Sequence, residues 1–183
     1  MSLEERFLDT ITSISPRTGE RIRSMLIWEN ERLSDETVAE KLNKINCHKT
    51  VLYLADVISE DEFLSDPKTS NVADFTFAEK ALTLSDKEFV SIKTDGELRS
   101  LAASCCANGH ICIGQIFTED LGHSFIVVKA DDDTFACFDK AGFRENPAKD
   151  NYDYKFRVYE LGNLLQSPKW RDAKWRFFPM PTK

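Results

Sequence analysis

The spacing of apolar residues changes along this chain from a helical to a strand-like pattern, and this change restricts the fold more than any other feature. Before residue 60, apolar residues recur at intervals of three or four. After residue 87, short apolar runs alternate with turn-forming residues. The first pattern predicts amphipathic helices and the second predicts short strands joined by tight turns. We therefore expect an α+β protein, with N-terminal helices followed by an antiparallel β-sheet.

The helical half divides into an extension and the start of a main domain. Residues 1–33 predict an N-terminal helical extension, and residues 34–183 predict one larger domain. Ser34 is the predicted N-cap of the next helix. The segment that follows Cys47 is apolar nearly all round, which is typical of a helix buried within a domain. We expect that buried helix to begin at Cys47.

The second half contains one hairpin whose register follows from its turn. Residues 123–130 and 134–139 predict two strands joined by the turn Asp131–Asp133, with Asp139 closing the second strand. Residues whose numbers add to about 264 would then face each other, which makes His123 and Asp139 diagonal neighbours about 7–8 Å apart at the backbone. Further strands are expected at 89–92, 110–117, 154–161 and 175–178, with a capped helix over 94–108.

Charge argues against polyanionic partners. The formal net charge is -7, from 31 acidic and 24 basic residues, so the surface repels nucleic acid and anionic membranes. A segment with interleaved cations and indoles, residues 169–176, is interpreted as a last strand or helix with a solvated face. No window is long and apolar enough to span a membrane, and residues 1–15 do not resemble a signal peptide. We expect a cytoplasmic protein, with non-classical export as an effector as the alternative.

The five cysteines are predicted to be free thiols. Their number is odd and their spacing is not dense, which is typical of a reducing compartment. Cys105, Cys106, His110 and Cys112 could be considered for zinc, but their spacing matches no standard zinc pattern. Packing in the core is the favoured interpretation, and we expect neither a metal nor an organic cofactor.

Cys47, His123 and Asp139 are the residues that best suit catalysis. A thiol becomes a useful nucleophile when a helix N-terminus or an imidazolium holds it as a thiolate. Cys47 would lie at a helix start, and His123 at a strand start after a glycine-containing turn. Asp139 would be within reach of the His123 ring and could fix its tautomer and orientation. The sequence therefore predicts a Cys-His-Asp triad.

This order of residues resembles the papain-like cysteine peptidase superfamily. A cysteine at a buried helix start precedes a histidine and an aspartate on consecutive strands. The stretches "NGHICIGQI", "GHSFIVV" and "FDKAG" resemble the C39-type branch, and the resemblance covers residues 46–58 and 87–143. It implies a papain-like fold for residues 34–183 and a cysteine hydrolase activity. Transglutaminases, arylamine acyltransferases and deamidases share the same skeleton, so the resemblance implies the fold more firmly than the substrate.

The sequence departs from this family at the oxyanion-binding position. Papain-like peptidases usually carry a Gln several residues before the nucleophile, where this chain has Lys41. Asn43 and Asn46 are the available side-chain amides, and Gln115 is a distant alternative. Asn46 is our candidate for the side-chain oxyanion donor, beside the Cys47 backbone N–H. His48 is adjacent to Cys47 but points about 100° away on a helix, so we expect it to line the cleft or contact substrate rather than act as the base.

The expected activity is cleavage or transfer at an amide bond of a protein or peptide substrate. The most direct interpretation is a cysteine peptidase, and the alternative enzyme is a transglutaminase or deamidase acting on protein glutamine. A different class of function is a non-catalytic papain-fold module that binds a protein through aromatic residues. The first residues to consider for that surface are Phe75, Phe77, Phe143, Phe177 and Phe178. The sequence does not indicate an oligomeric state.

Overall fold

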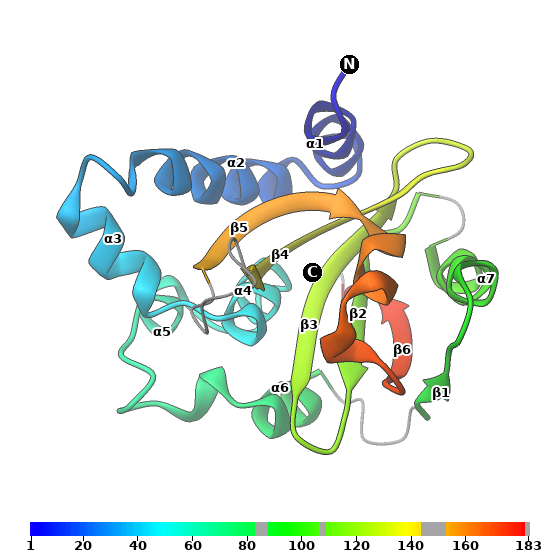
Figure 1. Ribbon diagram of the computed structural model, residues 1–183. Coiled ribbons are helices and arrows are strands. Elements are labelled where there is room, and N and C mark those ends of the chain that lie inside the picture. The colour runs from blue at the N-terminus through cyan, green and yellow to red at the C-terminus, as the bar shows by residue number, and fades with distance from the viewer. Residues whose placement is uncertain (83–87, 107–108, 144–152, 182–183) are drawn as a thin grey trace.

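The computed structural model describes residues 1–82, 88–106, 109–143 and 153–181. It confirms the predicted α+β class, with helices first and an open antiparallel sheet after them (Figure 1). The N-terminal half contains α1 (Leu3–Ile14), α2 (Pro16–Glu31), α3 (Glu36–Asn43), α4 (Cys47–Leu54), α5 (Glu60–Phe63), η1 (Asn71–Ala73) and α6 (Phe75–Ala81). The second half contains β1 (Val90–Ser91), α7 (Asp95–Cys106), β2 (Cys112–Phe117), β3 (Gly122–Lys129), β4 (Phe135–Phe143), β5 (Asp153–Glu160), η2 (Leu161–Gln166), η3 (Pro168–Trp170) and β6 (Lys174–Pro179).

The six-stranded sheet of the described residues has the order β1-β6-β2-β3-β4-β5, and every pair of neighbours is antiparallel. The β3–β4 hairpin has the predicted register, because its pairs run from Ile126↔Phe138 to Lys129↔Phe135. The C-terminal strand β6 inserts between β1 and β2. This insertion makes β2 and β3 central strands, and both are almost completely buried.

The predicted strand end at Asp139 is wrong. β4 continues to Phe143, and Asp139 lies in its middle. The reason is its second neighbour, since β4 pairs with β5 from Ala136↔Glu160 to Phe143↔Asp153. That ladder keeps the backbone extended through a stretch whose local sequence suggested a turn.

The predicted N-cap at Ser34 is also wrong, by one residue. Asp35 caps α3, with its Oδ1 accepting hydrogen bonds from the backbone N–H groups of Thr37 at 3.0 Å and Val38 at 3.4 Å. The Ser34 hydroxyl instead donates to the Glu31 carbonyl at 3.2 Å, at the end of α2. Serine and aspartate are both good N-caps, so residue type alone does not distinguish Ser34 from Asp35.

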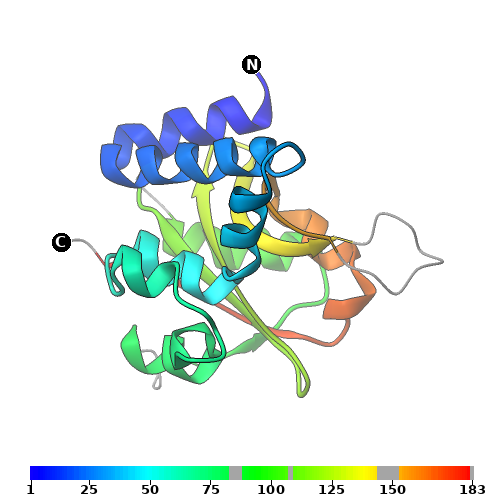
Figure 2. The same ribbon diagram turned by 90° about the vertical axis from the view of Figure 1, so that its left-hand side faces the viewer.

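Helices cover both faces of the sheet, and each face has its own apolar cluster. Ile126 faces a cluster shared with α1, α2 and α4, whereas Phe125 faces a cluster shared with α7, η2 and η3. α1 and α2 lie side by side (Figure 2). The Phe7 ring of α1 stacks on Phe138 of β4 with centroids 6.1 Å apart. The N-terminal helices thus pack into the same core as the sheet, and the proposed boundary after residue 33 stays a prediction.

Candidate active site

The predicted helix start at Cys47 is confirmed, and neighbouring groups hold it firmly. The Asn46 side chain caps α4, because its Oδ1 accepts from the Lys49 backbone N–H at 2.9 Å. Its Nδ2 donates to the Ala73 carbonyl at 2.8 Å and thereby ties the cap to η1. Cys47 is half-buried at the first position of the helix, where the partial positive charge of the helix end acts on its sulfur.

His123 and Asp139 lie where β3 and β4 separate. The ladder between these strands stops at Ile126↔Phe138, after which β3 stays paired with β2 and β4 stays paired with β5. α4 packs against both strands. The separation therefore opens the sheet beside the start of α4, with His123 on one strand and Asp139 on the other.

The His123 ring is held by a buried carboxylate and by aromatic rings. Its Nε2 lies 2.6 Å from Oδ2 of Asp139, and both side chains are buried. The Tyr159 hydroxyl donates to the same carboxylate oxygen. Phe125 and Trp170 stack near-parallel to the imidazole, with centroids 5.8 Å and 5.7 Å away. This environment restricts rotation of the ring and leaves Nδ1 as the nitrogen for Cys47.

The electrostatic effects on Cys47 and His123 favour an ion pair. Burial alone would raise the pKa of the Cys47 thiol, but interactions and hydrogen bonds with His48 and His123 bring that pKa well below 9.0. Burial alone would lower the pKa of His123, but Cys47 and Asp139, by charge and by hydrogen bonds, raise it to about 10. A lowered thiol pKa beside a raised imidazole pKa favours thiolate and imidazolium at neutral pH.

The two further predicted site residues are both near Cys47 and are both engaged. Asn46 caps the helix and holds Ala73, so one of its two amide hydrogens is already used. His48 is buried, with Nδ1 2.8 Å from the Ser124 hydroxyl and its ring edge-on to Phe75. His48 also contributes to the lowered pKa of Cys47, by charge and by hydrogen bonding. Its ring is therefore buried beside Cys47, and the substrate-contact role stays a prediction.

Sequence reasoning missed several residues that support the site. Tyr159 and Trp170 were not assigned to it, and Gln115 and Arg176 were not connected to His48. One signal was present in the sequence: Gln115 and Arg176 are polar residues within apolar strands, and a buried polar residue requires a partner. Trp170, Trp175 and Arg176 are buried, so the interleaved segment at 169–176 is not a continuous basic surface.

Of the remaining cysteines, Cys137 lies two residues before Asp139 on β4. Cys106, Cys112 and Cys137 are buried, Cys105 is half-buried, and all are free. A hydrogen bond with Cys112, together with burial, raises the pKa of Cys106, and burial and the Asp139 charge raise that of Cys137. Within the described residues, no group of three or more His, Cys, Asp or Glu side chains is arranged to hold a metal ion.

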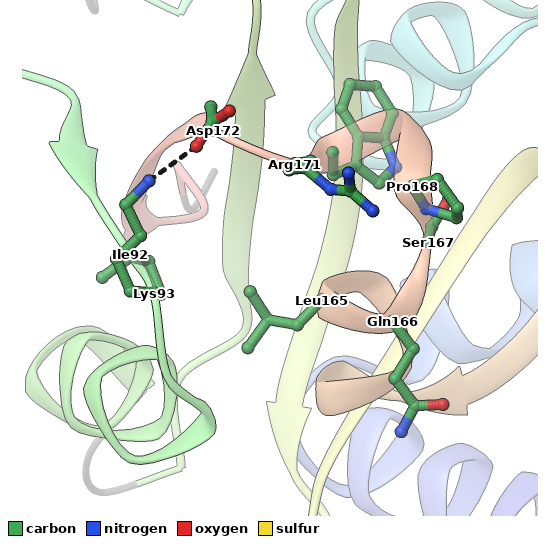
Figure 3. Close-up of a pocket in the computed structure, with 9 residues that line it drawn as sticks. Ile92, Lys93, Leu165, Gln166, Ser167, Pro168, Arg171 and Asp172 are labelled. Carbon is green, nitrogen blue, oxygen red and sulfur yellow. Dashed lines mark hydrogen bonds and ion pairs between the residues drawn. The ribbon is translucent and has the colours of Figure 1, made fainter.

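A cavity of about 180 Å³ is lined by residues 92–93 and by residues from the segment 165–172 (Figure 3). Lys93 and Asp172 of this lining form an ion pair at 2.8 Å. Trp170 also belongs to the lining and stacks on the His123 ring, so one side chain contacts both the cavity and the candidate site.

Comparison with known proteins adds no relative to this description. No family model matches the chain, and neither the curated proteins nor the solved structures show a significant match. Among the described helices, none has the length and apolar character needed to cross a membrane.

Proposed function

We propose that this protein is a papain-like cysteine hydrolase that cleaves amide bonds in a protein or peptide substrate. The observation that carries the proposal is the His123 ring, which bonds through Nε2 to Asp139 and whose pKa is raised by Cys47, a residue at a helix N-terminus. A nucleophile, a base and an orienting carboxylate joined in this order are the requirements for thiol catalysis. The papain-like assignment is further supported by the chain order of the three residues and by the α+β arrangement.

The first half of the reaction forms an acyl-enzyme. The Cys47 thiolate attacks the substrate carbonyl carbon, and the carbonyl oxygen becomes an oxyanion. The Cys47 backbone N–H and Asn46 are the proposed donors to that oxygen, because N–H groups in the first helical turn have no acceptor within the helix. The His123 imidazolium then gives its proton to the leaving amine as the C–N bond breaks.

The second half releases the acid. Water attacks the thioester, neutral His123 accepts a proton from that water, and the C–S bond breaks to restore the thiolate and the imidazolium. A primary amine in place of water would give transfer instead of hydrolysis. A glutamine side chain as the substrate, with water as acceptor, would give deamidation and release ammonia.

The test combines a chemical measurement with an activity measurement. Iodoacetamide labelling of Cys47 should persist well below neutral pH, and Cys105, which is half-buried on α7, is the internal control. A library of quenched peptides should be cleaved by the protein but not by Cys47→Ala. Incorporation of a fluorescent amine and release of ammonia distinguish transferase and deamidase from peptidase.

The binding-module alternative would gain support if Cys47 reacted only at ordinary thiol pH and no amide chemistry appeared. Only some of the aromatic residues first considered for a partner-binding surface are exposed in the folded protein. Phe177 and Phe178 are buried in the core, and Phe75 and Phe77 are partly exposed. The Phe143 side chain lies outside the described residues.

A further inference from the structure

A row of buried polar side chains runs across the sheet and ends at His48. Arg176 on β6, Gln115 on β2 and Ser124 on β3 are direct cross-strand neighbours. Arg176 Nε donates to Gln115 Oε1 at 2.9 Å, Gln115 Nε2 donates to Ser124 Oγ at 3.1 Å, and Ser124 Oγ lies 2.8 Å from His48 Nδ1. All of these residues are buried. Buried polar groups in an apolar layer are costly unless each is satisfied, so the row acts as one connected unit.

The direction of each hydrogen bond in the row follows from its first member. An arginine side chain has donors and no acceptor, so the Gln115 oxygen must face Arg176 and its NH₂ group must face Ser124. Ser124 therefore accepts from Gln115. Because its buried hydroxyl hydrogen needs an acceptor, and His48 Nδ1 is its other hydrogen-bond partner among the described residues, we assign that hydrogen to Nδ1. A ring nitrogen that accepts a hydrogen bond carries no proton, so Nδ1 of His48 is unprotonated and Nε2 carries the hydrogen.

Arg176, at the end of the row away from His48, also has charged and aromatic partners. Arg176 pairs with Glu79 of α6 at 2.7 Å, and its guanidinium lies 4.1 Å from the centre of the Phe89 ring. Phe75, also on α6, packs edge-on against His48. The charged and titratable groups connected to His48 are therefore Cys47, next to it on α4, and the Arg176–Glu79 pair at the far end of the row.

We propose that Arg176, Gln115 and Ser124 are positioning residues that hold His48 as a neutral Nε2–H donor to the Cys47 sulfur. The inference rests on the proposed function. The thiolate would then be stabilised by two imidazoles with different roles. His123 is the proton donor and acceptor of the reaction, whereas His48 keeps its proton and acts by hydrogen bonding.

The first experiment measures the tautomer in the unmodified protein. The chain contains three histidines, so ¹⁵N-histidine labelling gives a spectrum that His48→Gln can assign. At about pH 8 the expected signature is a protonated Nε2 and an unprotonated Nδ1 for His48. An Nδ1–H tautomer or a doubly protonated ring would overturn the inference, and His48→Gln serves only to assign the signal.

The second experiment measures the effect on the nucleophile. The pH midpoint of iodoacetamide labelling at Cys47, followed by mass spectrometry, should rise by about one unit in Ser124→Ala, roughly a tenfold loss of thiolate at low pH. Thr18→Val deletes a buried hydroxyl in α2, outside the row, and should leave the midpoint unchanged. Ser124→Thr keeps the hydroxyl and should restore the midpoint.

The outcomes separate this inference from the proposed function. A low midpoint in the unmodified protein that stays the same in Ser124→Ala would overturn the role of the row and leave the triad intact. An ordinary thiol midpoint in the unmodified protein would overturn the triad itself, and the inference with it.

Discussion

Nε2 of His123 lies 2.6 Å from Oδ2 of Asp139, and the two residues belong to neighbouring strands just beyond their last paired residues, Ile126↔Phe138. The ring bonds to the carboxylate through Nε2, and Cys47 also acts on it by charge and hydrogen bonding. The proposed triad therefore lies where β3 and β4 no longer pair with each other.

Substitutions of Asp139 should depend on whether an acceptor remains. Asp139→Asn keeps an oxygen that can accept from His123, so kcat/KM should fall about 10- to 100-fold, as for other residues that orient a catalytic group. Asp139→Ala removes the acceptor and should cost more. Steady-state kinetics of both variants give the order, and an equal loss in the two would contradict an orienting role.

Removal of either reacting group should nearly abolish turnover. Cys47→Ala and His123→Ala each remove one member of a unit, so the double variant should be little worse than either single variant. Cys47→Ala should keep a melting temperature close to that of the unmodified protein, because the side chain is small and half-buried. His123→Ala leaves the buried Asp139 carboxylate with one donor fewer and should lower the melting temperature. Cys105→Ala is the control and should keep full activity. Unfolding of Cys47→Ala would identify Cys47 as a structural residue.

The activity should have a bell-shaped pH dependence. On the acid side, activity falls as the Cys47 thiolate takes up a proton, which occurs well below 9.0 because His48 and His123 outweigh the effect of burial. On the alkaline side, activity falls as His123 loses the proton that the leaving amine requires, near its raised pKa of about 10. A profile of kcat/KM against pH tests both limits. An alkaline limit near the ordinary histidine pKa would contradict the ion pair.

Tyr159→Phe should weaken the support of Asp139 without removing it. The Tyr159 hydroxyl donates to Asp139, and burial followed by the Asp139 charge raises the Tyr159 pKa, so the hydroxyl keeps its proton. Its loss leaves a buried carboxylate with one donor fewer and should lower the free energy of unfolding by about 1–3 kcal/mol. Chemical denaturation measures this change. Activity should fall less than in Asp139→Ala.

Gly114→Ala should disturb the site from the neighbouring strand. A Cβ at Gly114 would lie 2.3 Å from Cζ of Phe125, the buried ring that stacks on His123. Relief of this clash should cost about 1–3 kcal/mol of stability and should reduce kcat. Gly96→Ala, whose Cβ would meet only Thr94 Oγ1 at 4.0 Å, is the matched control. Equal stability of the two variants would show that the Phe125 ring moves freely.

Local patterns were sufficient for the elements and for part of the site. Apolar periodicity predicted the α+β class, and the turn at Asp131–Asp133 predicted the register of the hairpin that carries His123 and Asp139. The buried apolar run predicted a helix start at Cys47. These features depend on residues close together in sequence, so their physical causes are visible in the chain itself.

Only the tertiary structure determined what surrounds those residues. β4 extends past Asp139 because β5 pairs with it, and the local sequence of β4 does not indicate that pairing. Arg176 reaches Gln115 because β6 inserts beside β2, although the two residues are far apart in the chain. Trp170 likewise stacks on the His123 ring although the two residues are far apart in the chain. Strand order depends on the packing of the whole domain, so contacts between distant segments follow from the fold and not from any local pattern.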